Sequence, residues 1–410
     1  MHQPTLLDTV PHPSVVSDPS TVLGRHFSDL VDEATLRPDP RQVEEFRSHA
    51  HCADPLADDV VEAMATDGPT VRAAVEAALA RGCTPSDDDP DPVRELFART
   101  AATPYWVDLR QVEAGQRALA RAGILGLMSL GSLALMGGYL SRRSIKPLVR
   151  TGELDAMAPR RLTETAAWWL EVTTPGSLRP GGKGVESVLR VRLTHAHVRR
   201  WMHRRPDWDY ESWDAPVNQI QMAGTHLLFS IACLGGLQRL GVRYDARERA
   251  AVMHLWRYVG WLMGIEDALL PATEADGWRL FWLMAATELD PDEDSRALAD
   301  ALTRSSGLAA ADAPDLVVQA GLAFNAGMSR YLLGDWACDV LGLQRSRGGA
   351  LAVRAFTRGV AAAELGRRVV PGGTRVAGLV GGATRRRFIE RAASALDADR
   401  SYGRDHLTTA

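Results

Sequence analysis

The stretch NQIQMAGTHLLFSIACLGGLQRLG, residues 218–241, decides the fold class of this chain. Its apolar side chains recur at intervals of three and four positions, which predicts a long helix. The same pattern returns after short breaks at 246–264, 277–289 and 313–334. Because no convincing alternation of apolar and polar residues predicts a strand, the expected fold class is all-α.

Earlier segments extend this pattern toward the N-terminus. APRRLTETAAWWLEV (158–172) predicts one helix, and another is expected from about Val185 to Trp201. The break between them, residues 173–184, contains two prolines and four glycines. Asn218 follows a turn that contains Pro216 and is expected to cap the next helix.

The composition is that of a globular protein. The chain has 410 residues, of which 46% are hydrophobic, and a formal net charge of only −4. Such a chain can bury a large core, and its charge argues against bulk attraction to nucleic acid. No repeat has a fixed period and the linkers are too short for a hinge, so we expect one helical domain. Its predicted limits are 23–395, between a flexible Pro-, Ser- and Thr-rich arm at 1–22 and a tail at 396–410.

The cysteines and the N-terminal residues bear on the cellular compartment in which the protein is expected. The four cysteines are scattered without a close pair, which is typical of a reducing environment. The first twenty residues have neither the basic start nor the apolar core of a secretory signal. We therefore expect a cytoplasmic protein.

One uncharged segment, AGILGLMSLGSLALMGGYL (122–140), is long enough to span a bilayer. It contains five glycines, stands alone in the middle of the chain, and has arginines on both sides. A helix that is apolar all round fits the core of a large protein equally well. We expect a buried central helix here and no stable membrane insertion.

Several catalytic motifs are missing from the sequence. It contains neither a GxSxG elbow nor an HExxH helix, and no histidine follows a glutamate by three positions, as helical di-iron sites require. The glycine-rich stretches at 181–184 and 369–387 lack the strand that precedes a phosphate-binding loop. Both are predicted to be turns.

RVRLTHAHVRRWMHRRPDW (190–208) gathers three histidines and six arginines in a slightly acidic chain. On a helix, Arg192, His195 and Arg199 share one face, while His197 points elsewhere. A lone helical histidine is most simply a structural residue, but it is also the one axial ligand that a haem requires. Arginines beside it would suit the haem propionates. The remaining arginines are expected to form a solvated basic helix end.

The preceding helix carries a second polar group of residues. Arg161, Glu164 and Thr165 place a cation, a carboxylate and a hydroxyl on one face. Taken alone, this is an i,i+3 ion-pair pattern of a surface helix. His226 and His254 lie in apolar helices and are predicted to be satisfied core histidines. The tryptophans are predicted to pack in the core; they include Trp168, Trp169, Trp256 and Trp261.

Three long stretches of the sequence together resemble the latex-clearing protein or rubber oxygenase family and the wider haem oxygenase-like superfamily around it. These are the residues from RRLTET to RRWM (160–202), from WDAPV to LGV (213–242), and from HLWRY to ALLP (254–271). The resemblance covers residues 120–340. It implies a globin-like helical core with additional helices that binds one non-covalent b-type haem. Members that cleave polyisoprene use O₂ to cut a carbon–carbon double bond, and related members act on shorter isoprenoid chains.

The resemblance also implies roles for individual residues. His195 matches the family's proximal iron ligand, and Arg192 and Arg199 match its neighbouring arginines. Arg161 and Thr165 match the distal-side arginine and threonine, which would donate hydrogen bonds to bound oxygen.

Two positions depart from the pattern of the rubber-cleaving members. Glu164 stands where they carry a distal lysine, and Lys146, before Pro147, stands where they carry a catalytic glutamate. Acid and base are thereby exchanged, and we expect Glu164 to be the general base or proton relay, with Lys146 near it in the catalytic site.

The leading hypothesis is a haem b-dependent oxygenase or dioxygenase that acts with O₂ on an apolar small molecule, for which the resemblance suggests an isoprenoid. The expected lack of secretion favours a substrate smaller than polymeric rubber. One alternative is a haem-binding sensor or carrier, whose histidine ligates iron without turnover. Another is an interaction module that uses the basic stretch.

Overall fold

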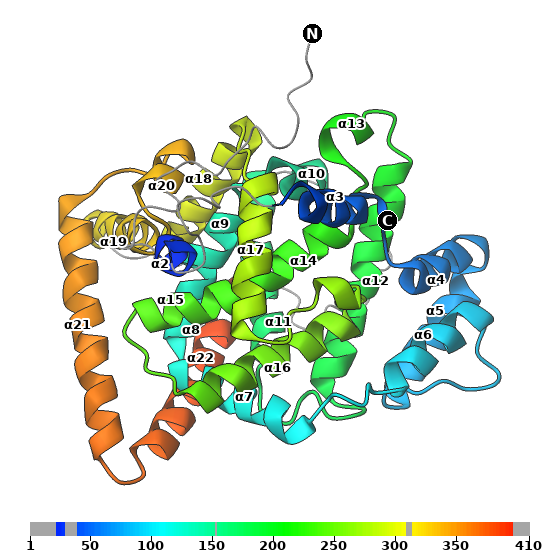
Figure 1. Cartoon of the computed structure of the whole chain (residues 1–410), viewed down its shortest axis with the longest axis horizontal. Coiled ribbons are helices and arrows are strands. Elements are labelled where there is room, and N and C mark those ends of the chain that lie inside the picture. Colours follow the sequence, from blue (N-terminus) through cyan, green and yellow to red (C-terminus); the bar gives the residue numbers. More distant parts are fainter. Residues whose placement is uncertain (1–21, 29–38, 152–153, 309–313, 397–410) are drawn as a thin grey trace.

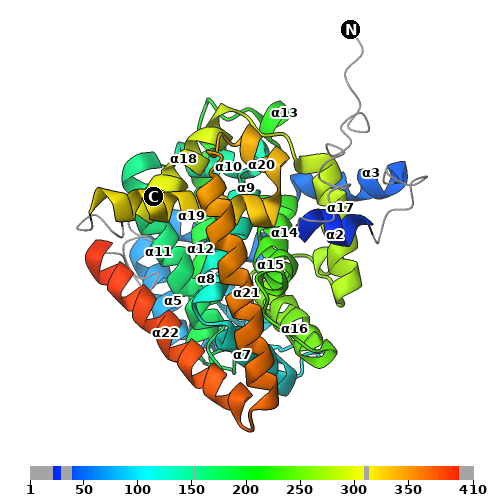
Figure 2. The same ribbon diagram turned by 90° about the vertical axis from the view of Figure 1, so that its left-hand side faces the viewer.

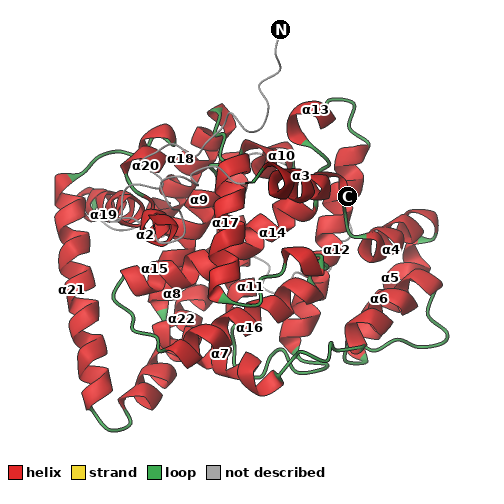
Figure 3. Cartoon of the chain, in the orientation of Figure 1, coloured by secondary structure: helices red, strands yellow, loops and turns green. Residues whose placement is uncertain are grey.

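A computed structural model describes residues 22–28, 39–151, 154–308 and 314–396 of the chain. Within these ranges all of the regular structure is helical, apart from an isolated bridge between Ser141 and Asp290 (Figure 3). The prediction of an all-α domain is confirmed. The predicted arm at 1–22 and tail at 396–410 lie almost wholly outside the described residues.

The helices follow one another with short connections. The N-terminal half contains α2 (Val22–Ser28), α3 (Pro40–Ser48), η3 (His49–His51), α4 (Pro55–Thr66), α5 (Gly68–Ala80), α6 (Asp91–Ala101), α7 (Leu109–Ala122), α8 (Ile124–Ser129), η4 (Leu130–Leu135), α9 (Met136–Gly138), α10 (Arg142–Arg150), α11 (Leu154–Val172) and α12 (Lys183–His203). The C-terminal half contains α13 (Tyr210–Trp213), α14 (Gln219–Leu227), η5 (Leu228–Ala232), α15 (Cys233–Arg239), α16 (Ala246–Leu262), η6 (Asp267–Leu269), α17 (Glu274–Glu288), α18 (Glu293–Leu308), α19 (Asp315–Leu333), α20 (Asp335–Val340), α21 (Arg347–Val369) and α22 (Gly373–Leu396).

The continuous helix α14–η5–α15 passes through the middle of the molecule (Figure 1). Asn218 begins it, and its side chain accepts a hydrogen bond from the backbone N–H of Gln221, so the predicted cap is confirmed. This helix, Gln219–Arg239, is long and apolar enough to cross a membrane, yet 89% of its most apolar window is buried inside the protein. Its apolar surface is therefore buried in the protein's own core.

The second central helix comes from the uncharged segment 122–140. It begins at Ile124, because Gly123 takes a positive φ of 57° and turns the chain by 89° between α7 and α8. Together α7 and the segment that follows would also be apolar enough for one broken span. Most of Ile124–Gly138 is buried or half-buried, so the prediction of a buried helix is confirmed, with its start two residues later than expected.

Both central helices contain a π-helical stretch, η4 in the first and η5 in the second, and the two stretches pack against each other. Around them lie the buried tryptophans, which include Trp168, Trp169, Trp256 and Trp261. The predicted core role of these tryptophans is confirmed.

The glycine-rich stretch at 369–387 corrects one prediction. A turn occupies only 370–372, and α22 begins at Gly373 (Figure 2). The low helix propensity of glycine is outweighed by packing. A Cβ at Gly381 would lie 2.5 Å from the carbonyl oxygen of Ala120 on α7, so glycine there allows the two helices to approach closely. The other glycine-rich stretch, 181–184, contains a turn before α12, as predicted.

Helices α4, α5 and α6 form a group at one edge of the molecule (Figure 1). Of these, α4 packs directly against α12, which carries His195. On its other side α12 packs against α11, which carries Arg161, Glu164 and Thr165. The fold thus brings the two helices with the predicted site residues together.

Candidate functional site

His195 lies in the middle of α12, on a stripe of residues that the neighbouring helices cover only partly. Val191 and Val198, four residues before and three residues after it, are also half-buried. On α11, which packs against α12, Leu162, Thr165 and Ala166 are half-buried in the same way. Apolar side chains left partly uncovered on two interior helices indicate a surface that can receive an apolar group.

Burial keeps the His195 imidazole neutral. Desolvation, together with the nearby Arg199 guanidinium, lowers its pKa to about 4 and outweighs the opposing effect of Asp54. Its Nδ1 is buried and has no hydrogen-bond partner in the described part of the chain. A neutral imidazole is the form that binds a metal.

Other histidines share some of these properties. Burial also lowers the pKa of His197 and His226 to about 4. The Nε2 of His226 is buried without a partner among the described residues, so the prediction of a satisfied core histidine is wrong there. His254 does accept a hydrogen bond, from the backbone N–H of Asp108 at 2.9 Å, and is satisfied as expected.

Arg192 and Arg199 both bond to carboxylates at the start of α4. Arg192 makes a bidentate contact with Asp54 at 2.6 and 2.7 Å, and the two side chains are 5% and 3% exposed. Arg199 contacts Asp58 at 2.7 Å and donates to the carbonyl oxygen of Val217. Their predicted role beside haem propionates stays a prediction. In the structure these two arginines connect α12 to α4 through their ion pairs with Asp54 and Asp58.

Two more arginines of the basic stretch are neutralised in a similar way. Arg190 contacts Glu76 on α5, and Arg200 contacts Glu62 on α4, each at 2.7 Å. Acidic residues from far along the chain therefore balance the cluster. This pairing favours neither a nucleic-acid face nor a free interaction patch.

On α11 the polar residues are arranged differently from the expected ion pair. Glu164 is 4% exposed and accepts a hydrogen bond from Arg160, four residues earlier, at 2.8 Å. Arg161 instead donates to the carbonyl oxygen of Leu148 and to the hydroxyl of Thr151. Burial lowers the pKa of Arg161, while the nearby Tyr139 and Glu164 raise it, so these groups lie close enough to interact.

Lys146 is buried, at 5% exposure, and lies in the middle of α10. Its ammonium group contacts Asp292 and Asp294 at the start of α18 and lies over the ring of Trp213. Among the described residues, no contact joins Lys146 to Glu164. Its predicted catalytic role stays a prediction.

A cavity of about 150 Å³ lies among four helical segments. These are the two central helices, which contain η4 and η5, together with α10 and α17. Most of its lining is apolar and includes Leu133, Ile145, Leu228, Phe229 and Met284. Both π-helical stretches contribute to the wall, and such stretches are frequent at functional sites. Another protein's engineered apolar cavity of this size binds benzene, so the space suffices for a small apolar group.

The cavity reaches the predicted polar face of α11 at two places. Tyr139 lines it and lies near Arg161, and Leu148, whose carbonyl oxygen accepts from Arg161, lines it too. Phe229 lines it and contacts Trp168 edge to face, with ring centroids 5.5 Å apart. Trp168 lies one turn after Thr165. The cavity therefore borders the face of α11 that carries Arg161 and Thr165.

Two polar groups stand out in the cavity wall. Thr225 is exposed although it lies within the largely buried helix α14, because its side chain faces the cavity. Burial raises the pKa of Tyr139 to about 12 against the opposing effect of Arg161, so its phenol stays protonated. A third wall residue, Glu288, is held by Arg47 at 2.9 Å.

Sequence reasoning missed Tyr139, Thr225 and Glu288. Thr225 could have been noticed in the sequence, since it is a polar residue within the most apolar helical segment. Tyr139 and Glu288 had no such local signal, because the residue after α9 and the end of α17 become neighbours of the cavity only through tertiary packing.

Comparisons with known proteins agree with the resemblance. A family model described as ER-bound oxygenase mpaB/B'/Rubber oxygenase, catalytic domain, matches residues 124–362. The rubber oxygenase of Streptomyces sp. (strain K30) is 25% identical over 263 residues, which span 62% of this chain and 61% of that protein. A solved structure of latex clearing protein LCP in the closed state superposes with a TM-score of 0.63 at 22% identity. The match covers 83% of this chain and 91% of that one, and it supports the fold.

Proposed function

Since the chain belongs to the family of the ER-bound oxygenase mpaB/B'/rubber oxygenase catalytic domain, we propose that it is a haem b-dependent oxygenase that uses O₂ to oxidise an apolar, isoprenoid-like small molecule. The observation that carries the proposal is the apolar cavity, which borders the face of α11 with Arg161 and Thr165. An oxygenase of apolar compounds needs such a water-poor space beside its polar catalytic groups.

The residues present fit a haem. His195 offers one neutral imidazole with a buried nitrogen that has no partner among the described residues, and a haem requires only one such histidine. The half-buried side chains on α11 and α12 would supply apolar contacts to such a largely apolar group. A bound haem would supply the iron at which O₂ is activated.

The chain's own residues then orient the reactants and handle protons. Arg161, anchored to α10 through Leu148 and Thr151, is a fixed cation and hydrogen-bond donor at the edge of the cavity. Glu164 is the candidate proton acceptor, and its contact with Arg160 holds its carboxylate in place. The apolar wall excludes water from the substrate and holds it by its shape.

The small volume of the cavity favours one isoprenoid unit or one ring as the group that enters it. For oxidative cleavage of a double bond, C=C and O₂ give two C=O groups, so that one oxygen atom enters each product. No further reductant is needed for this balance.

The direct test is to assay the purified, haem-loaded protein for O₂ uptake with a panel of terpenoid and aromatic compounds of increasing length. We expect substrate-dependent uptake and, with ¹⁸O₂ and rapid reduction of the carbonyls, one labelled oxygen in each product. Thr225→Trp should fill the cavity and raise KM by about tenfold or more, as expected for a loss of about 1.4 kcal/mol of binding. The haem spectrum should not change.

Leu351→Trp, on the exposed side of α21, is the matched control and should leave KM unchanged. A haem spectrum without O₂ uptake on any compound would favour the sensor or carrier instead. Full activity in the Thr225→Trp protein would place the substrate outside this cavity.

Glu164→Gln tests the proton acceptor. The amide keeps the size of the side chain but cannot take up a proton, so turnover should fall by about 10²- to 10⁴-fold with haem content unchanged. Arg160→Gln removes the partner of Glu164 and keeps its carboxylate, so its effect should be much smaller. Rates and haem spectra of both proteins check this, and full turnover in Glu164→Gln would remove Glu164 from the role.

A further inference from the structure

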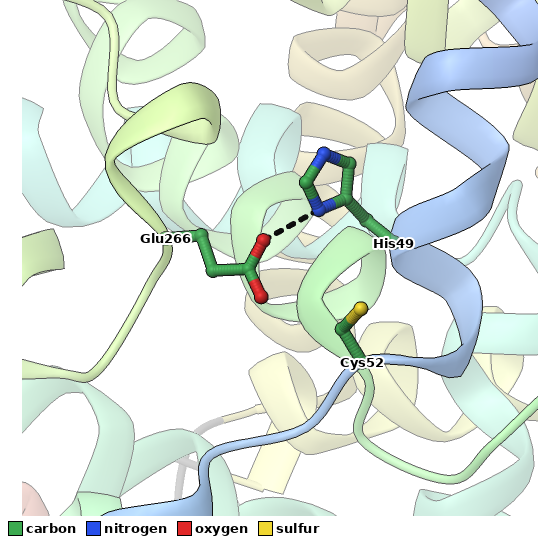
Figure 4. A group of neighbouring side chains, drawn as sticks. All are labelled: His49, Cys52 and Glu266. Carbon is green, nitrogen blue, oxygen red and sulfur yellow. Dashed lines mark ion pairs between the residues drawn. The ribbon is translucent and has the colours of Figure 1, made fainter.

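A cluster of three possible metal ligands lies away from the site described above. His49 begins η3, Cys52 follows that short helix, and Glu266 precedes η6. In Figure 4 the imidazole of His49 and the carboxylate of Glu266 point toward each other, and the thiol of Cys52 lies beside both. One donor atom from each of the three residues lies within 4.8 Å of the others.

We propose that His49, Cys52 and Glu266 bind a divalent cation of the zinc class, with water as the fourth ligand. Nitrogen, thiolate sulfur and carboxylate oxygen are the three donor types that zinc takes in proteins. A thiolate and a carboxylate also neutralise the two positive charges of the ion. A hard cation such as Ca²⁺ or Mg²⁺ would need more oxygen donors and would not select a thiolate.

The geometry requires only a small adjustment. Zinc bonds of about 2.0–2.3 Å place tetrahedral ligand atoms roughly 3.5 Å apart. Nδ1 of His49 now lies 2.5 Å from Oε2 of Glu266, so these two atoms must separate by about 1 Å while the sulfur approaches. The His49 Nδ1 atom is buried, and its contact with Glu266 lacks the angles of a hydrogen bond.

The backbone around the three ligands is already fixed. The N–H of Cys52 donates to the carbonyl oxygen of His49 at 3.2 Å, which holds the His-x-x-Cys turn. Gln219, which is 1% exposed, then ties the two ligand-bearing segments together. Its N–H donates to the carbonyl oxygen of Cys52 at 3.0 Å, and its Oε1 accepts from the N–H of Glu266 at 3.0 Å.

A different role for Cys52, as a reactive thiol, has less support. Burial and the Glu266 carboxylate both raise the pKa of its thiol, so the free protein holds little thiolate. A cation between the two groups would reverse this repulsion. The bound ion would join the segment after α3 to the loop after α16, two chain regions more than 200 residues apart.

Titration of the metal-stripped protein, with its haem retained, tests the site. Zn²⁺ competing with a chromogenic chelator should bind at one equivalent, and Co²⁺ should give the near-ultraviolet charge-transfer absorption of a cobalt–thiolate bond. Cys52→Ser and Glu266→Gln should weaken binding by about 100-fold or more, since even outer-sphere partners of metal ligands contribute about 10- to 100-fold. The cobalt–thiolate band should vanish in Cys52→Ser.

His51→Ala is the matched control, because His51 is an exposed histidine in the same short helix. It should bind both ions as the unaltered protein does. Unchanged zinc affinity in Cys52→Ser, or a Co²⁺ complex without thiolate absorption, would overturn the proposal. Neither result would bear on the oxygenase site, because the two sites share no residue.

Discussion

His195→Ala is expected to yield a folded protein that has lost its haem and, with it, all O₂ uptake. The imidazole is neutral and its Nδ1 is buried without a partner among the described residues, so its loss would remove the proposed iron ligand and cost little else. Affinity for haem should fall by at least about 100-fold, more than the loss of an outer-sphere partner would cause. The Soret absorption of the purified protein, measured against its protein absorption, checks this.

Two other buried histidines provide matched controls. His197 and His226 have equally lowered pKa values, and replacement of either by alanine should leave the Soret band in place. Added imidazole should partly restore haem binding to His195→Ala, because the small ring can enter the space left by the side chain. If His226→Ala lost the haem and His195→Ala kept it, the ligand would be His226.

Asp54→Ala is expected to reduce the free energy of unfolding by about 3–5 kcal/mol. Asp54 and Arg192 form a buried bidentate pair, and loss of the carboxylate leaves an uncompensated guanidinium in the interior. Arg192 lies one turn before His195, so the same change should also loosen the attachment of α12 to α4. Urea unfolding at matched haem content measures the effect.

Glu62→Ala is a control on the same two helices. It removes an exposed pair with Arg200, in which the Glu62 side chain is 68% exposed, and should leave the free energy of unfolding almost unchanged. Combining Asp54→Ala with Arg192→Met should recover part of the lost stability, since an apolar side chain then replaces the stranded charge. Equal costs for Asp54→Ala and Glu62→Ala would mean that Arg192 finds water or another partner.

Local sequence pattern was sufficient for most of the fold. Helix α12 was expected from about Val185 to Trp201 and runs from Lys183 to His203, because its apolar spacing and the preceding Pro- and Gly-rich break are both local. The start of α22 could not be predicted in this way. Its glycines disfavour a helix locally, and the reason for Gly381, its close approach to α7, appears only in the tertiary structure.

The candidate site was less accessible to sequence reasoning. Helical spacing placed Arg192, His195 and Arg199 on one face, but it could not identify Asp54 and Asp58, which lie more than 130 residues earlier and neutralise the two arginines. The same limit applied to Lys146, whose partners Asp292 and Asp294 lie far along the chain. Long-range ion pairs have no local pattern, so their members read as free charges in the sequence.

The π-helical stretches in the cavity wall have a consequence for how relatives of this protein can diverge. Each stretch accommodates extra backbone in a helix that continues on both sides. Deleting one residue there would return the helix to α-geometry, and the later side chains would keep their present directions, because the wide turn had absorbed that residue. The same deletion in a regular α-helix would rotate every later side chain by about 100°. A single-codon deletion in a π-helical stretch would thus alter the cavity wall locally while both helices stay in register beyond it, so substrate choice can change in one step without a new fold.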